Sequence, residues 1–376
     1  MRQLITFILL GGVSLVSMPR ALSQKSAPDV LIFTNGDQLT GHLESASGGS
    51  VVFKSDMAGE ITVPVDKVKE LRSATTFAVL RKGPPSKANL VGKGDVHIAD
   101  GNLTVSSSNQ PPVTIAAKDL GFLVDTPTYD KQVDHRVKFT QGWTGAITGG
   151  ATIVRSTDDA TSLTAGISLA RTMPSVAFLP LRNRTTFNLI ETYGKSTSPV
   201  IPQTDPPSPP DVVKTDIFHA DAERDQYFNP RFYALADTAF DHNFSQGLDL
   251  QQIYGVGIGW TPIQTAKQQL DLKAEIHYEK QKFQTGPNPN LIGTIFGENY
   301  HRTLPHKLLF TETGAFIPAW NHPSDYSAIV NGALILPVYK RLSTSLSATD
   351  NYLNDPSPGF NKNSFQFVAG VTYALR

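Results

Sequence analysis

Residues 365–376 read FQFVAGVTYALR and alternate apolar side chains with small or polar ones. One parity holds Phe365, Phe367, Ala369, Val371, Tyr373 and Leu375, and the other holds Gln366, Val368, Gly370, Thr372, Ala374 and Arg376. Because successive side chains of a strand point to opposite faces, this segment is predicted to be a strand with one apolar face. A soluble sheet would bury that face in a core, whereas a membrane barrel would turn it to lipid.

The same alternation recurs through the second part of the chain, from about Asp134. In QLDLKAEIHYEKQKF, residues 269–283, apolar and charged side chains take opposite parities. The pattern predicts strands near 141–155, 161–172, 183–194, 213–226, 231–243, 248–260, 268–283, 291–302, 306–317, 325–337, 340–353 and 363–375. The number is even, and most of these segments reach the roughly 9–11 residues that cross a bilayer at a tilt.

The connections between these predicted strands alternate between long and short. Long polar segments such as KSTSPVIPQTDPPSPPD follow the odd strands, and the intervening links are mostly tighter, with TMPSVAFLPL and TPIQTAKQ as exceptions. Trp143, Trp260 and Trp320 fall at predicted strand ends, where an aromatic belt would lie. We therefore predict an all-β fold, with a twelve-stranded antiparallel outer-membrane barrel over residues 134–376. Lipid would then face Phe365, Phe367, Val371, Tyr373 and Leu375; a soluble barrel or sandwich is the alternative.

The first residues have the pattern of a secretory signal. Arg2 precedes an apolar run from Leu4 to Val16, and small residues stand before Gln24. We predict a signal peptide over residues 1–23; the alternative is an uncleaved anchor, although the run is shorter than the roughly 20 residues of a spanning helix. The chain has no cysteine, which excludes disulfides and thiol chemistry, and 33 basic against 33 acidic residues give no argument for nucleic acid.

Residues 28–127 are predicted to form a small periplasmic β domain with an internal repeat. LIFTNGDQLTGHLES indicates a hairpin, and residues 49–71 align without gaps on residues 101–123. Each copy reads as two strands and a short turn, so two small barrel-like or sandwich units are expected. The residues Asp37, His42, Asp66, His97 and Asp100 are scattered without metal-ligand spacing, and we expect a binding role.

One segment resembles a known family. YFNPRFYALADTAFDHNFSQGLDLQQIYGVGIGWTPI, with its Phe240-Asp241 pair and its Gly-x-Gly strand, is similar to the central motif of the salt-induced outer membrane proteins, domain of unknown function 481. The resemblance covers about residues 134–376. It implies a porin-like β-barrel in the outer membrane of a Gram-negative-type bacterium and no established activity. Many such barrels end on an aromatic residue read by the outer-membrane barrel assembly machinery, whereas this sequence ends on Leu375-Arg376.

We predict no catalytic, cofactor-binding or metal site. A barrel phospholipase would place a histidine and a serine two apart on a strand, whereas His242 and Ser245 in DHNFSQG are three apart and have no evident orienting partner. His301 and His306 lack zinc spacing. The cluster of Asp216, His219, Asp221, Glu223, Arg224 and Asp225 could bind a cation or line the lumen, and solvated lumen and loop positions explain it without a ligand. The candidates for lining the lumen are Asp249, Asp271, Lys273, Glu275 and His277, which we expect to form a salt-bridged plug.

These features predict a non-enzymatic outer-membrane protein, either a structural barrel or a narrow solute passage, with its N-terminal domain in the periplasm. The expected partners are outer-membrane lipid, the barrel assembly machinery, and peptidoglycan or another envelope protein. A lipid-acting outer-membrane enzyme and a soluble secreted β-sheet binding protein are the alternatives.

Overall fold

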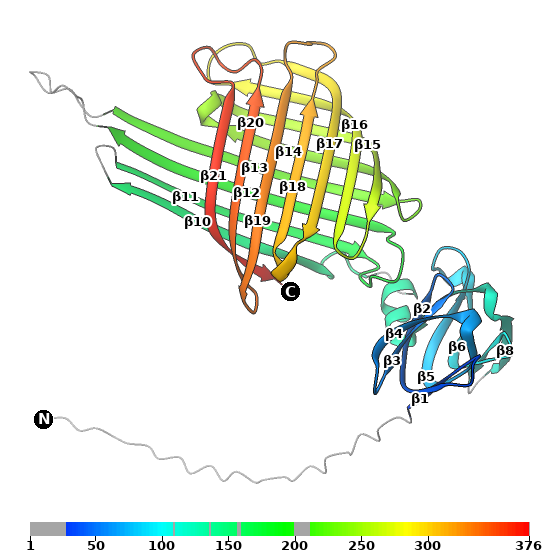
Figure 1. Ribbon diagram of the computed structural model, residues 1–376. Helices are drawn as coiled ribbons and strands as arrows, with labels where there is room; N and C mark the ends of the chain where they lie inside the picture. Colours follow the sequence, from blue (N-terminus) through cyan, green and yellow to red (C-terminus); the bar gives the residue numbers. More distant parts are fainter. Residues whose placement is uncertain (1–27, 108–109, 135–136, 156–158, 199–210, 376) are drawn as a thin grey trace, which may run out of the picture. The chain divides into compact units, whose positions relative to one another are not determined.

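The computed structural model describes residues 28–107, 110–134, 137–155, 159–198 and 211–375 (Figure 1). The predicted signal peptide lies outside the described residues. Two compact units are present, one over residues 28–81 and 91–125, the other over residues 82–90 and 126–375. No helix in the described part of the chain is long and apolar enough to cross a membrane.

The first unit is one nine-stranded sheet with the order β4-β3-β2-β1-β5-β6-β7-β8, in which β9 pairs with β2 and β5. Its strands are β1 (Asp29–Phe33), β2 (Gln38–Ser47), β3 (Ser50–Ser55), β4 (Gly59–Pro64), β5 (Val68–Arg81), β6 (Leu90–Ala99), β7 (Asn102–Ser107), β8 (Gln110–Ala116) and β9 (Leu120–Asp125). Short 3-10 turns, η1 (Val65–Lys67) and η3 (Ala117–Asp119), precede β5 and β9, and η2 (Lys87–Asn89) precedes β6.

The internal repeat is real at the level of structure. The order β3-β4-η1-β5 in the first copy recurs as β7-β8-η3-β9 in the second. Aligned positions are buried alike, since Leu71 and Leu123 are both 0% exposed, and Val63 and Ile115 are 6% and 7% exposed. The expectation of two small units was wrong, however. Both copies contribute to a single sheet and a single buried cluster, because β9 of the second copy pairs with β2 and β5.

The second unit is a closed twelve-stranded barrel, which confirms the predicted fold. Every strand pairs antiparallel with its neighbour in the chain, and β10 pairs with β21 to close the wall. The strands are β10 (Trp143–Arg155), β11 (Asp159–Met173), β12 (Asn183–Ser198), β13 (Asp211–Tyr227), β14 (Phe232–Asn243), β15 (Leu248–Gln264), β16 (Gln268–Phe283), β17 (Asn290–Thr303), β18 (Leu309–Ile317), β19 (Ser327–Tyr339), β20 (Leu342–Leu353) and β21 (Asn363–Leu375).

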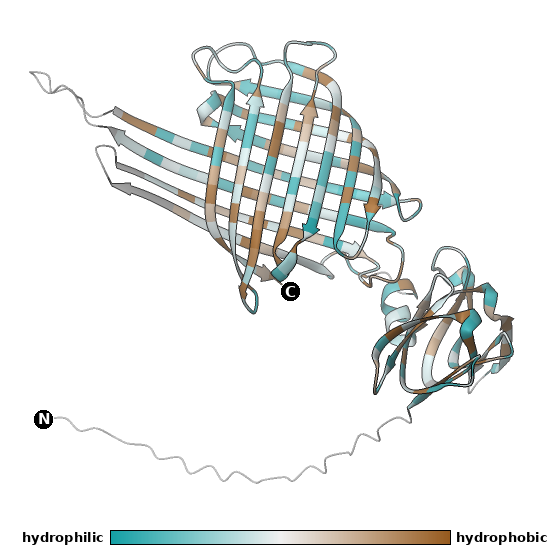
Figure 2. Ribbon diagram, in the orientation of Figure 1, coloured by the Kyte–Doolittle hydropathy of each residue, from teal (hydrophilic) through white to brown (hydrophobic). Residues whose placement is uncertain are grey.

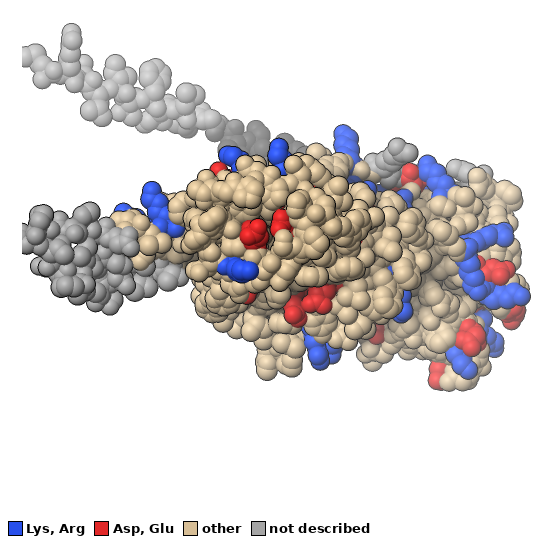
Figure 3. All heavy atoms as spheres, turned by 90° about the horizontal axis from the view of Figure 1, so that it is seen from above, with Lys and Arg blue, Asp and Glu red and all other residues tan. Residues whose placement is uncertain are grey.

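The two faces of the barrel wall differ in character. Figure 2 shows hydrophobic and hydrophilic residues alternating along the strands. On β21, Phe365, Phe367, Val371 and Tyr373 are exposed on the outer face. On β16 the outer Ile276 is 57% exposed, whereas Glu275 and His277 on either side of it are buried. Seen from above, basic and acidic side chains are dispersed between broad areas free of either (Figure 3).

The links between strands also differ between the two ends of the barrel. With an even number of antiparallel strands, β10 begins and β21 ends at the same end, here called the terminal end. Most links at the terminal end are short, and the link over residues 174–182 is the long exception. It is hydrogen-bonded to the π-helical turn η4 (Asp130–Asp134), which follows α1 (Thr126–Tyr129). Gln132 of η4 accepts from Ser175 N at 3.0 Å, and Arg182 donates to the Gln132 carbonyl at 3.0 Å. The second expected exception, TPIQTAKQ, is not one, because β15 extends to Gln264.

Candidate functional site

Charged side chains gather around Arg184 on the inner face of the barrel. Its Nε donates to Asp225 Oδ2 at 2.6 Å, and its Nη1 donates to Asp271 Oδ2 at 2.8 Å. Its Nη2 lies 3.8 Å from Glu223 Oε1, and Glu223 in turn accepts from Lys273 Nζ. We call these five residues the Arg184 network. It contains three carboxylates and two cations, so it is close to charge balance.

The Arg184 network joins strands that are not neighbours in the wall. Arg184 on β12 and Asp225 on β13 are register partners. Asp271 and Lys273 lie on β16, which β14 and β15 separate from β13. The side chains of Arg184 on β12 and Asp271 on β16 can reach each other across three intervening strands only if the wall is strongly curved between β12 and β16. The ion pairs therefore hold a curved section of the barrel together on its inner side.

Further contacts fix Asp271 and Arg184 in place. Thr261 Oγ1 donates to Asp271 Oδ1 at 2.6 Å, and Gln269 Nε2 donates to Asp271 Oδ2 at 2.9 Å. The Arg184 guanidinium carbon lies 5.5 Å from the ring centroid of Tyr233, within the range of a cation–π interaction. Buried ions need such saturation, because each charge loses several kcal/mol of hydration.

Three glycines of β15 provide the space for this packing. An added Cβ at Gly259 would lie 2.0 Å from Tyr233 Cζ, and one at Gly255 would lie 2.1 Å from Asp237 Oδ1 and 2.7 Å from Glu275 Oε2. At Gly257 the Cβ would lie 2.7 Å from Glu275 Cγ. Side chains from the neighbouring strands β14 and β16 thus lie directly over the backbone of β15. The glycines of β15 therefore leave room on the inner face of the barrel for the side chains of the charged site.

The inner wall here is packed instead of being lined by open water. Asp225, Asp271 and Glu275 are 1%, 2% and 4% exposed, and the packing continues along β16 through His277, Glu279 and Gln281, all buried. Side chains that line a water-filled channel keep a larger exposed fraction. On β13, by contrast, Val213 is 57% exposed. The interior is packed along β16 and around Asp225 at one end of β13, and it is open around Val213 at the other end of β13.

The structure brings together four of the five predicted lumen-lining residues. Asp271, Lys273, Glu275 and His277 follow one another on the inner face of β16. His277 lies over Gly293 of β17, where an added Cβ would be 2.9 Å from its Cε1. Asp249 lies apart from them, half-buried and paired with the exposed Lys282 at 3.2 Å.

The acidic cluster of β13 divides between the two faces of the wall. His219, Asp221, Glu223 and Asp225 share one parity, and Asp216 and Arg224 share the other. His219 lies between two carboxylates, with Nδ1 2.6 Å from Asp241 Oδ1 and Nε2 3.1 Å from Asp221 Oδ1. Asp241 belongs to the aromatic-Asp pair of the family-like motif. Its observed role is to hold His219 on the inner wall.

Sequence reasoning missed Arg184, the centre of the network. The residue stands in a strand of mixed polar residues, NRTTFNLIETYGKSTS, without acidic neighbours. One signal was present: pairing of the predicted strands 183–194 and 213–226 as a hairpin would set Arg184 against Asp225. The contact with β16 had no such signal, because it depends on the curvature of the wall.

The structure also describes the residues of the two chemical alternatives, a phospholipase-like His–Ser pair and a metal site. The ring of His242 has Nδ1 2.8 Å from the Asp249 carbonyl oxygen, and Ser245 lies in the turn η5 (Phe244–Gln246). Between these two described residues there is no hydrogen bond. In the described part of the chain, no three His, Asp or Glu side chains are grouped so that they could hold a metal ion.

Comparisons with known proteins give one family match. No curated protein matches the sequence. Among solved structures, the β domain of the Bordetella autotransporter Brka is similar at 11% identity and a TM-score of 0.30, covering 62% of this chain and 98% of that chain. The translocator domain of the autotransporter NalP from Neisseria meningitidis is similar at 10% identity and a TM-score of 0.32, covering 61% of this chain and 87% of that chain. The CymD monoaromatic hydrocarbon channel is similar at 7% identity and a TM-score of 0.30, covering 80% of this chain and 86% of that chain. A family model described as "Protein of unknown function, DUF481" matches residues 147–375, more than half of the chain.

Proposed function

This chain belongs to the DUF481 family, and from that premise we propose that it is a non-enzymatic β-barrel protein of the outer membrane. Its barrel is a narrow solute passage whose lumen is constricted by the Arg184 network. The first unit is a periplasmic binding module. Its partner is peptidoglycan or another envelope protein, and the barrel assembly machinery inserts the barrel into the lipid.

The outer face of the barrel supports the membrane location. Large apolar side chains are exposed along β15, β16, β19 and β21, among them Val256, Ile258, Ile276 and Phe367. Monomeric soluble proteins rarely expose contiguous apolar surface on this scale. The strands are also long enough to cross a bilayer at a tilt. Since β10 begins and β21 ends at the terminal end, this end would face the periplasm, where the first unit lies.

One observation carries the proposal of a constricted lumen, namely the ion pair between Arg184 on β12 and Asp271 on β16. It draws together strands that β13, β14 and β15 separate, and so reduces the free cross-section of the barrel at the terminal end. A barrel of about twelve strands lies between filled small barrels and open porins of sixteen or more, so inner side chains decide whether it conducts.

Single-channel recording in planar bilayers tests this proposal. The test variant is Glu223→Ala with Lys273→Ala, which removes an inner ion pair and leaves the net charge unchanged. The matched control is Asp249→Ala with Lys282→Ala, which removes an ion pair outside the Arg184 network. We expect a small unit conductance for the wild-type protein and the control, and a larger one for the test variant. Equal conductance in all three proteins would contradict a constriction at this site.

A further inference from the structure

The closing seam of the barrel is paired along only part of its length. Residues 145–150 of β10 pair with residues 370–375 of β21. On their other sides, β10 pairs with β11 from Trp143 to Arg155, and β21 pairs with β20 from Asn363 to Tyr373. In the described residues, β21 before Gly370 has no partner on the β10 side. Figure 1 shows the two strands meeting near the terminal end and diverging beyond it.

Small residues and hydroxyls mark the last paired positions of the seam. An added Cβ at Gly370 would lie 2.6 Å from the Gly149 carbonyl oxygen, so the backbones approach closely here. On the inner face Thr148 Oγ1 lies 3.1 Å from Thr372 Oγ1. Thr372 Oγ1 in turn donates to Ser345 Oγ at 3.2 Å. The paired half of the seam is therefore tight, and the separation begins abruptly after Gly150.

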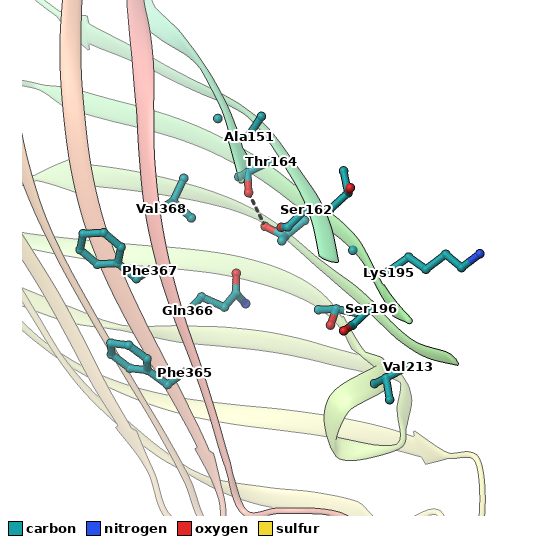
Figure 4. Close-up of a pocket in the computed structure, with 15 residues that line it drawn as sticks. Ala151, Ser162, Thr164, Lys195, Ser196, Val213, Phe365, Gln366, Phe367 and Val368 are labelled. Atoms are coloured by element: carbon teal, nitrogen blue, oxygen red, sulfur yellow. Dashed lines mark hydrogen bonds between the residues drawn. The ribbon is translucent and has the colours of Figure 1, made fainter. Parts of the chain in front are cut away.

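A hollow of about 260 Å³ lies where the strands separate (Figure 4). Its lining includes Gln366 and Val368 from the inner parity of β21 and Phe365 and Phe367 from the outer parity. Figure 4 shows Gln366 on the side of β21 that faces the hydroxyl residues, and the rings of Phe365 and Phe367 on the other side. In a continuous wall the next strand would cover this edge of β21, so the hollow lies where the wall is incomplete.

The chemistry of this hollow changes from one side to the other. Toward the lumen it is lined by hydroxyl groups from β11 and β12, including Ser162 and Thr164, with Thr164 Oγ1 3.1 Å from Thr192 Oγ1. Toward the outer face it is bordered by Phe365 and Phe367, which are 68% and 61% exposed. No carboxylate borders it among the described residues.

The unpaired backbone groups of β21 before Gly370 need hydrogen-bond partners from outside the sheet. Within the hydrocarbon of a bilayer, each unpaired backbone N–H or C=O costs several kcal/mol, and irregular backbone is tolerated only where it lines protein or a polar cavity. The edge of β21 before Gly370 needs polar partners at the depth of Phe367. Water in the hollow or the head group of an amphiphile provides them, and an acyl chain alone does not.

We propose that the barrel opens sideways between β10 and β21 and that a membrane lipid enters the opening, with its polar head in the hydroxyl-lined hollow and its chain along Phe365 and Phe367. The inference rests on the proposed membrane location and names the class of molecule that the passage admits. The opening then links the bilayer to the part of the lumen beyond the Arg184 network.

Fluorescence quenching by lipid tests the opening directly. The chain has no cysteine, so a single introduced cysteine in the full-length protein can carry a bimane probe. The probe is placed at Gln366→Cys in the opening, at Phe367→Cys on the outer face, and at Thr313→Cys on the inner face of β18. Thr313 is linked to Gln366 through the register pairs Thr313–Asn331, Asn331–Thr349 and Thr349–Gln366. The proteins are reconstituted in vesicles of phosphatidylcholine with dibrominated acyl chains.

Bromine quenches only on close approach, so each position reports its own contact with the acyl chains. We expect clear quenching of the probe at residue 366, although less than at residue 367 because the head group occupies the hollow and the chain lies along the outer face, and no quenching of the probe at residue 313. Quenching at 367 with none at 366 would overturn the lateral opening and leave the membrane barrel intact. Absence of quenching at 367 would overturn the membrane location itself.

Discussion

Arg184 on β12 and Asp271 on β16 form an ion pair of 2.8 Å, although β13, β14 and β15 separate their strands in the barrel wall. The Arg184 guanidinium lies over the Tyr233 ring, and that ring lies over Gly259 of β15. Gly255 and Gly257 leave room in the same way for the side chains of Asp237 and Glu275. The glycines of β15 and the buried ion pairs therefore belong to one curved section of the wall, the section that we propose narrows the lumen.

Replacing Arg184 by methionine is expected to destabilise the barrel by about 3–5 kcal/mol, because Asp225 and Asp271 would remain buried without their cation. The free energy of unfolding is measured by urea titration of the barrel in detergent. Adding Asp271→Asn to this variant should recover part of the loss, since it removes one of the unpaired charges.

The control for this variant is Arg224→Met on β13. Arg224 is exposed, takes the opposite parity to Asp225, and donates to the hydroxyl of Thr185. Its loss should change the free energy of unfolding by no more than about 0.5 kcal/mol. An equal effect of both substitutions would show that the inner position of Arg184 is irrelevant.

Gly259→Ala is expected to cost about 1–3 kcal/mol, because the new Cβ would overlap the Tyr233 ring and force the two strands to shift. In a Tyr233→Ala background the same substitution should add little further loss. Gly332→Ala on β19 is the matched control, since nothing lies within 4 Å of its added Cβ. Destabilisation of the same size at both glycines would refute the proposal that β15 must be free of side chains where Tyr233 packs over it.

Leu71→Ala and Leu123→Ala test the single core of the first unit. Both side chains are 0% exposed at equivalent positions of the repeat, and each truncation should cost about 2–5 kcal/mol. Hydrogen exchange of the full-length protein should show faster exchange in both copies for either variant. Met57→Ala, at a side chain that is 92% exposed, should change neither copy. Faster exchange confined to the mutated copy would mean that the copies fold separately.

Much of the fold could be predicted from the sequence, because apolar and polar side chains alternate with period two along a strand whose two faces meet different surroundings. Predicted and observed strands agree closely, and the segment 268–283 has the same bounds in both. The single core of the first unit could not be predicted in this way. The pairing of β9 with β2 and β5 is a long-range choice that a local repeat does not encode.

The candidate site shows the same limit. Asp271, Glu275 and His277 could be assigned to the inner face from parity alone. The importance of Arg184 depends on which strands the curved wall brings together, and parity says nothing about curvature. The incomplete pairing between β10 and β21 depends on where the last strand meets the first, which no single strand pattern specifies.

Heat-modifiability of the full-length protein extracted from membranes tests whether the second unit is a closed membrane barrel. Unboiled and boiled samples are compared by electrophoresis in dodecyl sulfate. A closed membrane barrel resists the detergent until it is heated, so we expect a fast-migrating unboiled band that slows after boiling. Identical migration of both samples, with the protein recovered in buffer without detergent, would contradict the membrane barrel.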